Sequence, residues 1–243
     1  MSEGEASPVV FITGSGRRLG RQIAFAFADG GYDVVLHAHA SVEGMEQARQ
    51  AIEAKGRRAF AVRGDVSRVA DLRHMADEAL AAAGRLDVLV HNAGTFPEAA
   101  FDEVTEEMWD AAQHINTRSI FFLTQACAPA LRASKGSVVV IASVGGMQAW
   151  RRHIPYNVSK AGAIMLTRAL AKELAPAIRV NAVAPGIVLV PGEEERAHPS
   201  AERIPLLRYG LPADLAGAVL FLARAPYITG QVLAVDGGTS AAT

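Results

Sequence analysis

The sequence predicts a single α/β domain built on a doubly wound, Rossmann-type parallel sheet of about seven strands, with helices on both faces. Short runs of Val, Leu and Ile recur along the 243 residues, and most are continuous rather than alternating. Continuous apolar runs are typical of strands that are buried on both faces. The alanine-rich stretches between them are long enough to cross over as helices, so the strands are expected to lie parallel. No linker interrupts the pattern, and residues 1–243 are therefore interpreted as one domain.

The predicted strands and helices alternate along the whole chain. The expected strands are Val9–Ile12, Val34–Leu36, Phe60–Val62, Leu86–Val90, Val138–Ala142, Val180–Val183 and Val232–Val235. The expected helices are Leu19–Asp29, Val42–Lys55, Val69–Ala83, Thr105–Gln113, Ile120–Arg132, Tyr156–Leu174 and Ala213–Ala223. The segment between the last two strands is rich in Pro, Gly and Glu and lacks periodicity. Because a long loop inside a domain is usually a functional lid, we expect a mobile substrate loop at about residues 186–208.

Composition excludes several classes of protein. Half of the residues are hydrophobic, mean hydropathy is +0.17 and the net charge is −1, which excludes a disordered chain. A pI of 6.7 leaves no basic excess for binding nucleic acid. No apolar run approaches the roughly 18 residues of a membrane span, and residues 1–8 lack a signal-peptide pattern. Cys127 is the single cysteine, which fits the reducing cytoplasm that we expect.

A glycine-rich segment follows the first predicted strand directly. It reads Thr-Gly-Ser-Gly-Arg-Arg-Leu-Gly over residues 13–20, and a predicted helix begins at once. Glycine permits a tight turn and a close approach of the backbone to a pyrophosphate, and the helix N-terminus attracts the anion. A glycine-rich turn alone is weak evidence, but its place in a strand–turn–helix unit raises its weight. The candidate cofactor-binding residues here are Gly14, Arg17, Arg18, Leu19 and Gly20.

Charge at the end of the second strand indicates which nicotinamide cofactor is preferred. An acidic residue there bonds the ribose 2′-hydroxyl of NAD and repels a 2′-phosphate. Asp33 begins that strand instead of ending it. Arg17 is placed to meet a 2′-phosphate, and His37 and Ser41 are expected to add hydrogen-bond donors. We therefore expect NADPH/NADP+ rather than NADH.

The candidate catalytic pair is Tyr156 and Lys160, four residues apart at the start of a predicted helix. This spacing places both side chains on one helix face. We expect the lysine ammonium to lower the pKa of the phenol, which is about 10 in its reference state. The tyrosine then exchanges a proton with a carbonyl or hydroxyl oxygen while hydride moves at the adjacent carbon. Ser143 follows the fifth strand, where its hydroxyl is expected to bind the substrate oxygen.

Taken together, these motifs resemble those of the short-chain dehydrogenase/reductases, over residues 8–238. The glycine-rich segment with Arg18 at its middle position is similar to that of the pteridine reductases. The resemblance implies a hydride-transfer enzyme in which Asn116 anchors a water of the proton relay. It also implies cofactor contacts from the residues that end later strands. These are Asp65 and Val66 at the adenine, Asn92, Ala93 and Gly94 on the pocket floor, and Pro185, Gly186 and Val188 near the nicotinamide. Tyr156 and Lys160 are also expected to bind the cofactor.

The sequence leaves the substrate open between two branches of this family. Phe96 matches the aromatic residue that stacks on a pterin in the pteridine reductases. Ser143 stands where those enzymes have an aspartate, and serine is the arrangement of 3-oxoacyl-carrier-protein reductases. We therefore expect reduction of a carbonyl or a pterin-type C=N bond, with a 3-oxoacyl thioester reductase as the alternative. Phe96, Ser143 and Tyr156 are the predicted substrate-binding residues.

Three other interpretations remain from the same residues. A non-catalytic NADP(H)-binding sensor on this fold would be free to lose Tyr156 or Lys160. His37 and His39 share a strand face, but two histidines without a third ligand make a weak metal site, and no metal is expected. The apolar residues Ile164, Met165, Ala169 and Leu170 suit either a core helix or an interface, and the family resemblance implies a homotetramer.

Overall fold

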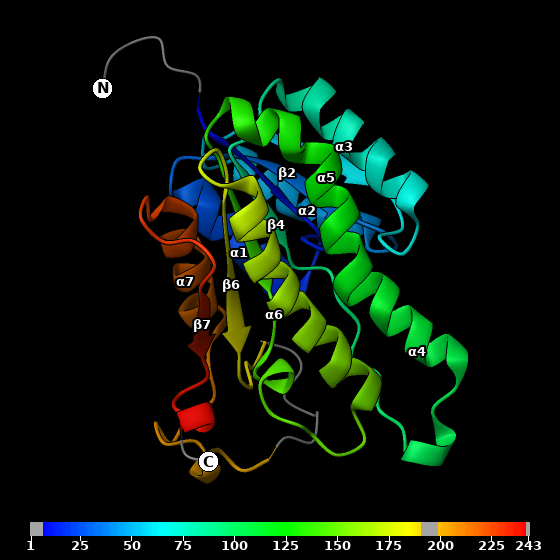
Figure 1. Cartoon of the computed structure of the whole chain (residues 1–243). Coiled ribbons are helices and arrows are strands. Elements are labelled where there is room, and N and C mark those ends of the chain that lie inside the picture. The colour runs from blue at the N-terminus through cyan, green and yellow to red at the C-terminus, as the bar shows by residue number, and fades with distance from the viewer. Residues whose placement is uncertain (1–6, 191–198, 242–243) are drawn as a thin grey trace.

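The computed structural model describes residues 7–190 and 199–241. In that part, all seven strands form one parallel sheet in the order β3-β2-β1-β4-β5-β6-β7 (Figure 1). The strands are β1 (Val9–Ile12), β2 (Asp33–Ala38), β3 (Ala59–Arg63), β4 (Val88–His91), β5 (Ser137–Ile141), β6 (Arg179–Pro185) and β7 (Val232–Val235). The predicted doubly wound parallel sheet is confirmed.

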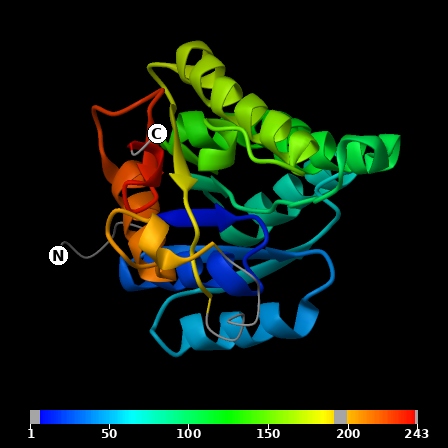
Figure 2. The same ribbon diagram turned by 90° about the horizontal axis from the view of Figure 1, so that it is seen from below.

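Helices cover both faces of the sheet (Figure 2). The side chains of α1 (Arg18–Asp29), α2 (Val42–Glu53) and α7 (Pro212–Arg224) pack on one face. Those of α3 (Val69–Ala83), α5 (Ser119–Ala133) and α6 (Ile154–Leu174) pack on the other. The helix α4 (Glu106–Gln113) continues into α5 through a π-helical turn, His114–Arg118, so the two form one long rod in Figure 1.

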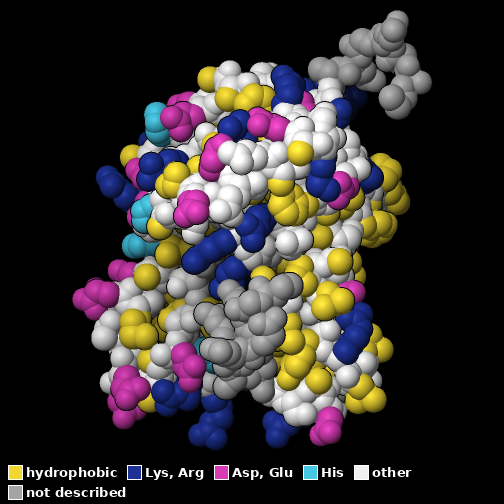
Figure 3. All heavy atoms as spheres, turned by 180° about the vertical axis from the view of Figure 1, so that it is seen from behind, with side chains coloured by type: hydrophobic (Ala, Val, Ile, Leu, Met, Phe, Trp, Pro, Cys, Tyr) yellow, Lys and Arg dark blue, Asp and Glu magenta, His cyan; other side chains and the backbone are white. Residues whose placement is uncertain are grey.

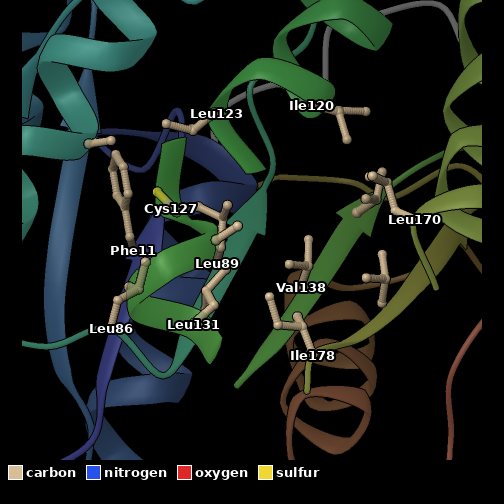
Figure 4. Close-up of a cluster of buried hydrophobic side chains, with 14 of the residues drawn as sticks. Phe11, Leu86, Leu89, Ile120, Leu123, Cys127, Leu131, Val138, Leu170 and Ile178 are labelled. Carbon is tan, nitrogen blue, oxygen red and sulfur yellow. The ribbon is translucent and has the colours of Figure 1, made fainter. Parts of the chain in front are cut away.

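Each face has its own hydrophobic core because alternate residues of every strand point to opposite sides. Phe11 and Leu89 point toward α3 and α5, where they meet Leu123 and Leu131 (Figure 4). Their neighbours Val10 and Ile12 point the other way, toward α1 and α7. Strands β1, β2, β4 and β5 are buried along their whole length, as their continuous apolar runs predict.

The sheet edges and several element ends differ from the sequence prediction. Strands β7 and β3 are only partly buried, because each pairs with one neighbour only. Helix α6 begins at Ile154, two residues before Tyr156, since Pro155 fits the first helical turn. Asn116, expected within a regular helix, lies in the π-helical turn. Asp33 begins β2 as expected, and its carboxylate binds Arg58, the residue directly before β3.

The sheet topology creates a crevice between β1 and β4. Chain order reverses there, since β2 and β3 lie to one side of β1 and β4–β7 lie to the other. The loops that leave the carboxyl ends of β1 and β4 therefore diverge, which is where ligands bind in sheets of this kind. The predicted substrate loop is described only in part: residues 191–198 lie outside the described residues, and 199–208 include a short 3-10 helix, Ala201–Arg203.

Candidate active site

The glycine-rich loop is folded against the end of β4 through close backbone approaches. Gly14 has a φ of 65°, a conformation that glycine adopts without strain. A Cβ atom on Gly20 would lie 2.2 Å from the Gly14 oxygen and 2.5 Å from Asn92 Nδ2, so no larger residue fits there. The loop therefore requires Gly14 for its tight turn and Gly20 for its close packing on Gly14 and Asn92.

Hydrogen bonds from β4 hold this loop in place. The side-chain amide of Asn92 donates to the carbonyl oxygens of Thr13 and Gly14 at 2.9 and 3.0 Å. The hydroxyl oxygen of Thr13 accepts bonds from the backbone N–H groups of Asn92 and Ala93, both at 3.0 Å. The Asn-Ala-Gly segment thus joins the turns that leave β1 and β4, in agreement with the role that the resemblance implied.

A cavity of about 500 Å³ opens over this loop. It is lined by the predicted residues Gly14, Arg17, Arg18, Leu19, Gly20, His37, Ser41, Asp65, Val66, Asn92, Ala93, Gly94 and Val188. It is also lined by residues that the sequence analysis did not assign to the cofactor, namely Gly16, Ala38, His39, Ala40, Ile115, Ile141 and Val190. The predicted cofactor residues from five different loops therefore meet in one place. The side chains of Ile115 and Ile141 carried no signal in the sequence, because they resemble ordinary core residues.

Two arginines stand at the mouth of this cavity, where α1 begins. Arg17 and Arg18 are exposed, and the N-terminus of α1 contributes partial positive charge. Arg18 has a φ of 51°, in the left-handed region that favours glycine. Figure 3 shows Lys and Arg side chains gathered near the middle of the face opposite to that of Figure 1. This environment suits an anionic ligand.

His37 does not act as the hydrogen-bond donor that the sequence analysis expected at the 2′-phosphate. The ring is buried, its Nδ1 accepts a bond from the Gly14 N–H at 2.9 Å, and Nε2 lies 3.1 Å from the Gly64 oxygen. Both ring nitrogens are therefore used by the backbone. His39, which is exposed, lines the cavity in the place where a donor was expected.

Asp65 shapes the turn after β3. Its carboxylate accepts a bond from the Ser67 N–H at 2.8 Å, and its own N–H donates to Asp71 Oδ2 at 2.9 Å. Helix α3 begins at Val69, four residues beyond Asp65, with Arg68 at its N-cap position, so Asp65 caps a turn and not the helix itself. Val66 follows Asp65 and is buried at the wall of the cavity.

Tyr156 and Ser143 meet beyond the far end of this cavity. Ser143 follows β5 and Tyr156 lies in the first turn of α6, so two separate elements bring the hydroxyl groups together. Ser143 Oγ accepts a bond from the Gly145 N–H at 3.0 Å, and its hydroxyl is hydrogen-bonded to the Tyr156 phenol. Because a hydroxyl has one proton and two lone pairs, this arrangement leaves Ser143 able to donate.

The pKa of Tyr156 is raised, contrary to the lowering that we expected from Lys160. Burial of the phenol raises the pKa, and the hydrogen bond from Ser143 lowers it only in part. Lys160 Nζ lies 5.9 Å from the centre of the tyrosine ring and donates to the Ile141 carbonyl at 2.8 Å. The ammonium is thus bound to β5 and does not contact the phenol oxygen in a way that offsets the burial.

Lys160 is itself buried, and this changes its titration. Burial lowers the pKa of its ammonium to about 8. Within residues 7–190 and 199–241, only the carbonyl of Ile141 accepts a hydrogen bond from Lys160 Nζ, so the charge is incompletely compensated. A lysine with such a pKa is able to give up a proton near neutral pH, which a surface lysine is not.

Asn116 uses its side chain to join two parts of the site. Its Oδ1 accepts from the Thr95 N–H, and its Nδ2 donates to the Thr95 oxygen and to Ser159 Oγ, all at 2.9 Å. Ser159 Oγ in turn donates to the Tyr156 carbonyl at 2.8 Å. Asn116 therefore ties the loop after Gly94 to the first turn of α6. The sequence analysis missed Ser159, since a serine inside the Tyr-x-x-x-Lys spacing gives no separate signal.

Aromatic side chains surround the phenol. Phe96 meets the Tyr156 ring edge to face at 4.6 Å and stacks on His153 at 4.3 Å, while 52% of Phe96 stays exposed. Trp150 lies nearly parallel to the Tyr156 ring at 6.1 Å. Asn157 holds this loop through a bond from Nδ2 to the Trp150 carbonyl at 2.9 Å. Trp150 and His153 were not predicted as site residues, because they lie in a loop without a motif.

The ends of β6 and β7 lie beside this region. The Gly186 N–H donates to the Val235 carbonyl at 3.0 Å, and a Cβ atom on Gly186 would lie 2.8 Å from Asp236 Cβ. Pro185 ends β6, and Val188 forms an isolated bridge with Gly210. Of these three predicted residues, only Val188 lines the cavity.

Metal binding and membrane insertion find no support in the described residues. No group of three or more His, Cys, Asp and Glu side chains within residues 7–190 and 199–241 is placed to hold a metal ion. His37 has no free ring nitrogen to offer one. Among the described helices, none combines the length and the apolar character that crossing a bilayer requires.

Comparison with known proteins places the chain in a family. A family model described as enoyl-(acyl carrier protein) reductase matches residues 14–240. The ketoacyl reductase 2 of the granaticin polyketide synthase from Streptomyces violaceoruber is 42% identical over 242 residues, which cover 96% of each chain. The 3-oxoacyl-(acyl-carrier-protein) reductase of Staphylococcus aureus is 36% identical over 235 residues, or 93% of this chain and 96% of the relative.

Solved structures agree with these matches. A blue fluorescent protein from a metagenomic library, solved in complex with NADPH, superposes with a TM-score of 0.90 at 34% identity, over 96% of this chain and 97% of that chain. The fold, the order of the motifs and the extent of the matches all point the same way. This chain belongs to the short-chain dehydrogenase/reductase family of oxidoreductases.

Proposed function

We propose that this protein is an NADPH-dependent reductase that converts the carbonyl of a 3-oxoacyl thioester to a hydroxyl. The observation that carries the proposal is the Tyr156 phenol, hydrogen-bonded to Ser143 in the crevice beside the glycine-rich cavity. A serine, and not an acid, suits a carbonyl oxygen. Two relatives named as ketoacyl and 3-oxoacyl-carrier-protein reductases, at 42% and 36% identity, support this substrate class.

The residues of the cavity fit a dinucleotide. Gly14 and Gly20 let the loop and the start of α1 pack closely against Asn92 and Ala93, and the N-terminus of α1 lies at the cavity and attracts an anion. Arg17, His39 and Ser41 line the cavity and supply cations and a hydroxyl for a 2′-phosphate. NADPH supplies the hydride when it is bound. The neighbour solved with NADPH supports the assignment of this cofactor.

In the proposed mechanism the chain's own residues bind the substrate oxygen and deliver a proton. Ser143 donates a hydrogen bond to the carbonyl oxygen and polarises it. Tyr156 then gives its phenolic proton to that oxygen, and its raised pKa keeps the phenol protonated at neutral pH. The Lys160 ammonium stabilises the phenolate left behind. Asn116 acts as a positioning residue through Thr95 and Ser159, and its relay water stays a proposal.

A pterin is the second candidate substrate, and Phe96 is the observation that favours it. The ring is 52% exposed beside Tyr156, so a flat heterocycle has a surface on which to stack. Against a pterin, Ser143 offers no acidic proton for a ring nitrogen. The sensor interpretation is not favoured, because Tyr156, Lys160 and Ser143 are all present and brought together.

A substrate panel tests this proposal. NADPH oxidation is followed against 3-oxoacyl thioesters, dihydropterins, folates and simple ketones, and we expect turnover of the thioesters. In Tyr156→Phe we expect at least about a 100-fold loss of kcat with unchanged NADPH affinity, because only the general acid is removed. Turnover confined to pterins would replace the substrate class, and full activity of Tyr156→Phe would refute the mechanism.

The pH dependence of reduction tests the role of Lys160. Its pKa of about 8 means that the ammonium is present below pH 8 and lost above it. We therefore expect kcat for reduction to fall as the pH rises through about 8, as the phenolate loses its cationic neighbour. In Lys160→Met, kcat is expected to be low at every pH and to lack this step. The same step in the variant would show that another group titrates.

Arg17→Ala tests the preference for NADPH. We expect the KM for NADPH to rise about tenfold or more, because a charge-assisted bond to the phosphate is worth roughly 1.5–3 kcal/mol. The KM for NADH should stay the same, since NADH lacks that phosphate. Arg73→Ala, which removes an exposed arginine from α3, serves as the matched control. Equal losses for both cofactors in Arg17→Ala would contradict the assignment.

We further infer a homotetramer in the cytoplasm. Of the four apolar residues singled out on α6, Ile164 and Leu170 are buried in the core, whereas Met165 is 61% exposed and Ala169 is exposed. Phe121 on α5 is also exposed, so an apolar strip is available to a second copy. Light scattering measures the assembly, and a monomer would overturn it. The cytoplasmic location rests on the single buried cysteine, Cys127.

A further inference from the structure

His37 occupies the junction between three loops that line the cavity. It lies near the end of β2, and only 2% of it is exposed. Its Nδ1 accepts the N–H of Gly14 in the loop after β1, at 2.9 Å. Its Nε2 lies 3.1 Å from the carbonyl oxygen of Gly64, which ends β3 next to Asp65. One ring therefore connects the phosphate side of the cavity to its adenine side.

The two partners determine the protonation state of the ring. A backbone N–H is only a donor, so Nδ1 must carry a lone pair. A carbonyl oxygen is only an acceptor, so Nε2 must carry the proton. A neutral ring with its proton on Nε2 satisfies both bonds, whereas a protonated ring would place two donors against each other at Gly14. Burial favours the same neutral form, since it lowers the pKa of His37.

The backbone of His37 strengthens the same junction. Its carbonyl oxygen accepts the Ser15 N–H at 2.9 Å, and its N–H donates to Ser15 Oγ at 2.9 Å. Ser15 Oγ donates in turn to the Ile12 carbonyl at 2.8 Å. Unlike these bonds of the His37 backbone, the bond to Gly14 is made by the His37 ring. A substitution of His37 can therefore remove it without altering the hydrogen bonds of the backbone.

The charged groups around the ring come from each neighbouring segment. His39 on the same strand lowers the pKa of His37, and Asp65 after β3 raises it by less than burial lowers it. Arg17 and Arg18 line the same cavity from the start of α1. Of these groups, His39 adds to the cost of a positive charge on His37.

We propose that His37 is a positioning residue for the dinucleotide: its neutral ring holds Gly14 in the conformation that receives the pyrophosphate and fixes that loop to Gly64. The proposal rests on the proposed function, because it takes the glycine-rich loop to be the dinucleotide site. It differs from a contact with the 2′-phosphate in a way that can be measured. The pyrophosphate is common to NADPH and NADH, so loss of the ring weakens both equally and leaves their ratio unchanged.

Three substitutions separate the two ring bonds. In His37→Asn, the amide oxygen stands near the position of Nδ1 and keeps the bond from Gly14. In His37→Gln, the amide nitrogen reaches the position of Nε2 and keeps the bond to Gly64. His37→Leu removes both. Because a buried hydrogen bond contributes about a kcal/mol, we expect the Kd of both dinucleotides to rise about tenfold in the Leu variant and to recover in the Asn variant more than in the Gln variant.

Titration calorimetry of NADPH and NADH provides these constants without turnover. His74→Leu, which replaces an exposed histidine on α3, is the matched control and should bind both dinucleotides as the unchanged protein does. At saturating NADPH, we expect kcat of the His37 variants to change far less than KM. A selective loss of NADPH affinity would show that His37 contacts the 2′-phosphate, and unchanged affinity in the Leu variant would show that the ring is dispensable. Either result overturns the proposal.

Nitrogen NMR of histidine-labelled protein reads the protonation of the ring directly in the unchanged protein. Near pH 6.5, the reference pKa of an imidazole, His37 should show a protonated Nε2 and an unprotonated Nδ1. The signal is assigned by its absence in His37→Asn. A charged ring or a proton on Nδ1 overturns the proposal. If the unchanged protein binds neither dinucleotide, the proposed function fails, whereas the NMR result still decides the state of His37.

Discussion

The site depends on the bond between two turns that leave neighbouring strands in opposite directions. Asn92 after β4 donates hydrogen bonds of 2.9–3.0 Å to Thr13 after β1, from its backbone N–H and its side-chain amide, and the amide also donates to the Gly14 oxygen. Without this link, the reversal of chain order at β1 and β4 would leave a gap with unpaired backbone groups. These hydrogen bonds hold the glycine-rich loop in place at the base of the cavity. The other loops that line the cavity are arranged around this loop.

The candidate catalytic residues, in contrast, come from separate helices, strands and turns that meet at one point. Ser143 comes from the end of β5, Tyr156 and Lys160 from α6, and Asn116 from the π-helical turn between α4 and α5. Side-chain bonds through Ser159 and the carbonyl of Ile141 hold them in register. A buried polar network of this kind is rigid only when its members are satisfied, and here most are. The same burial sets the pKa of Tyr156 and Lys160 in opposite directions.

The sequence alone predicts the fold and the main site residues because both follow from local patterns. Continuous apolar runs specify buried strands, and the Gly14–Gly20 and Tyr156–Lys160 spacings each lie within one turn or one helix. Properties that depend on the three-dimensional environment were not predictable. Burial, and not the neighbouring lysine, decides the direction of the Tyr156 pKa shift. His37 looked like a phosphate donor until its two backbone partners were known. Ser159 and Trp150 carry no motif at all.

The π-helical turn at His114–Arg118 has a consequence for how the chain tolerates change in length. A π-turn contains one residue more than an α-turn, and such bulges are frequent at functional sites. Deleting one residue there would let α4 and α5 merge into an ordinary helix that is itself sound. The same deletion would turn everything on its N-terminal side by about 100° about the helix axis. Asn116 would then face away from Ser159. The π-helical turn is therefore not needed for the stability of the α4–α5 helix itself, but it is needed to align that helix with α6.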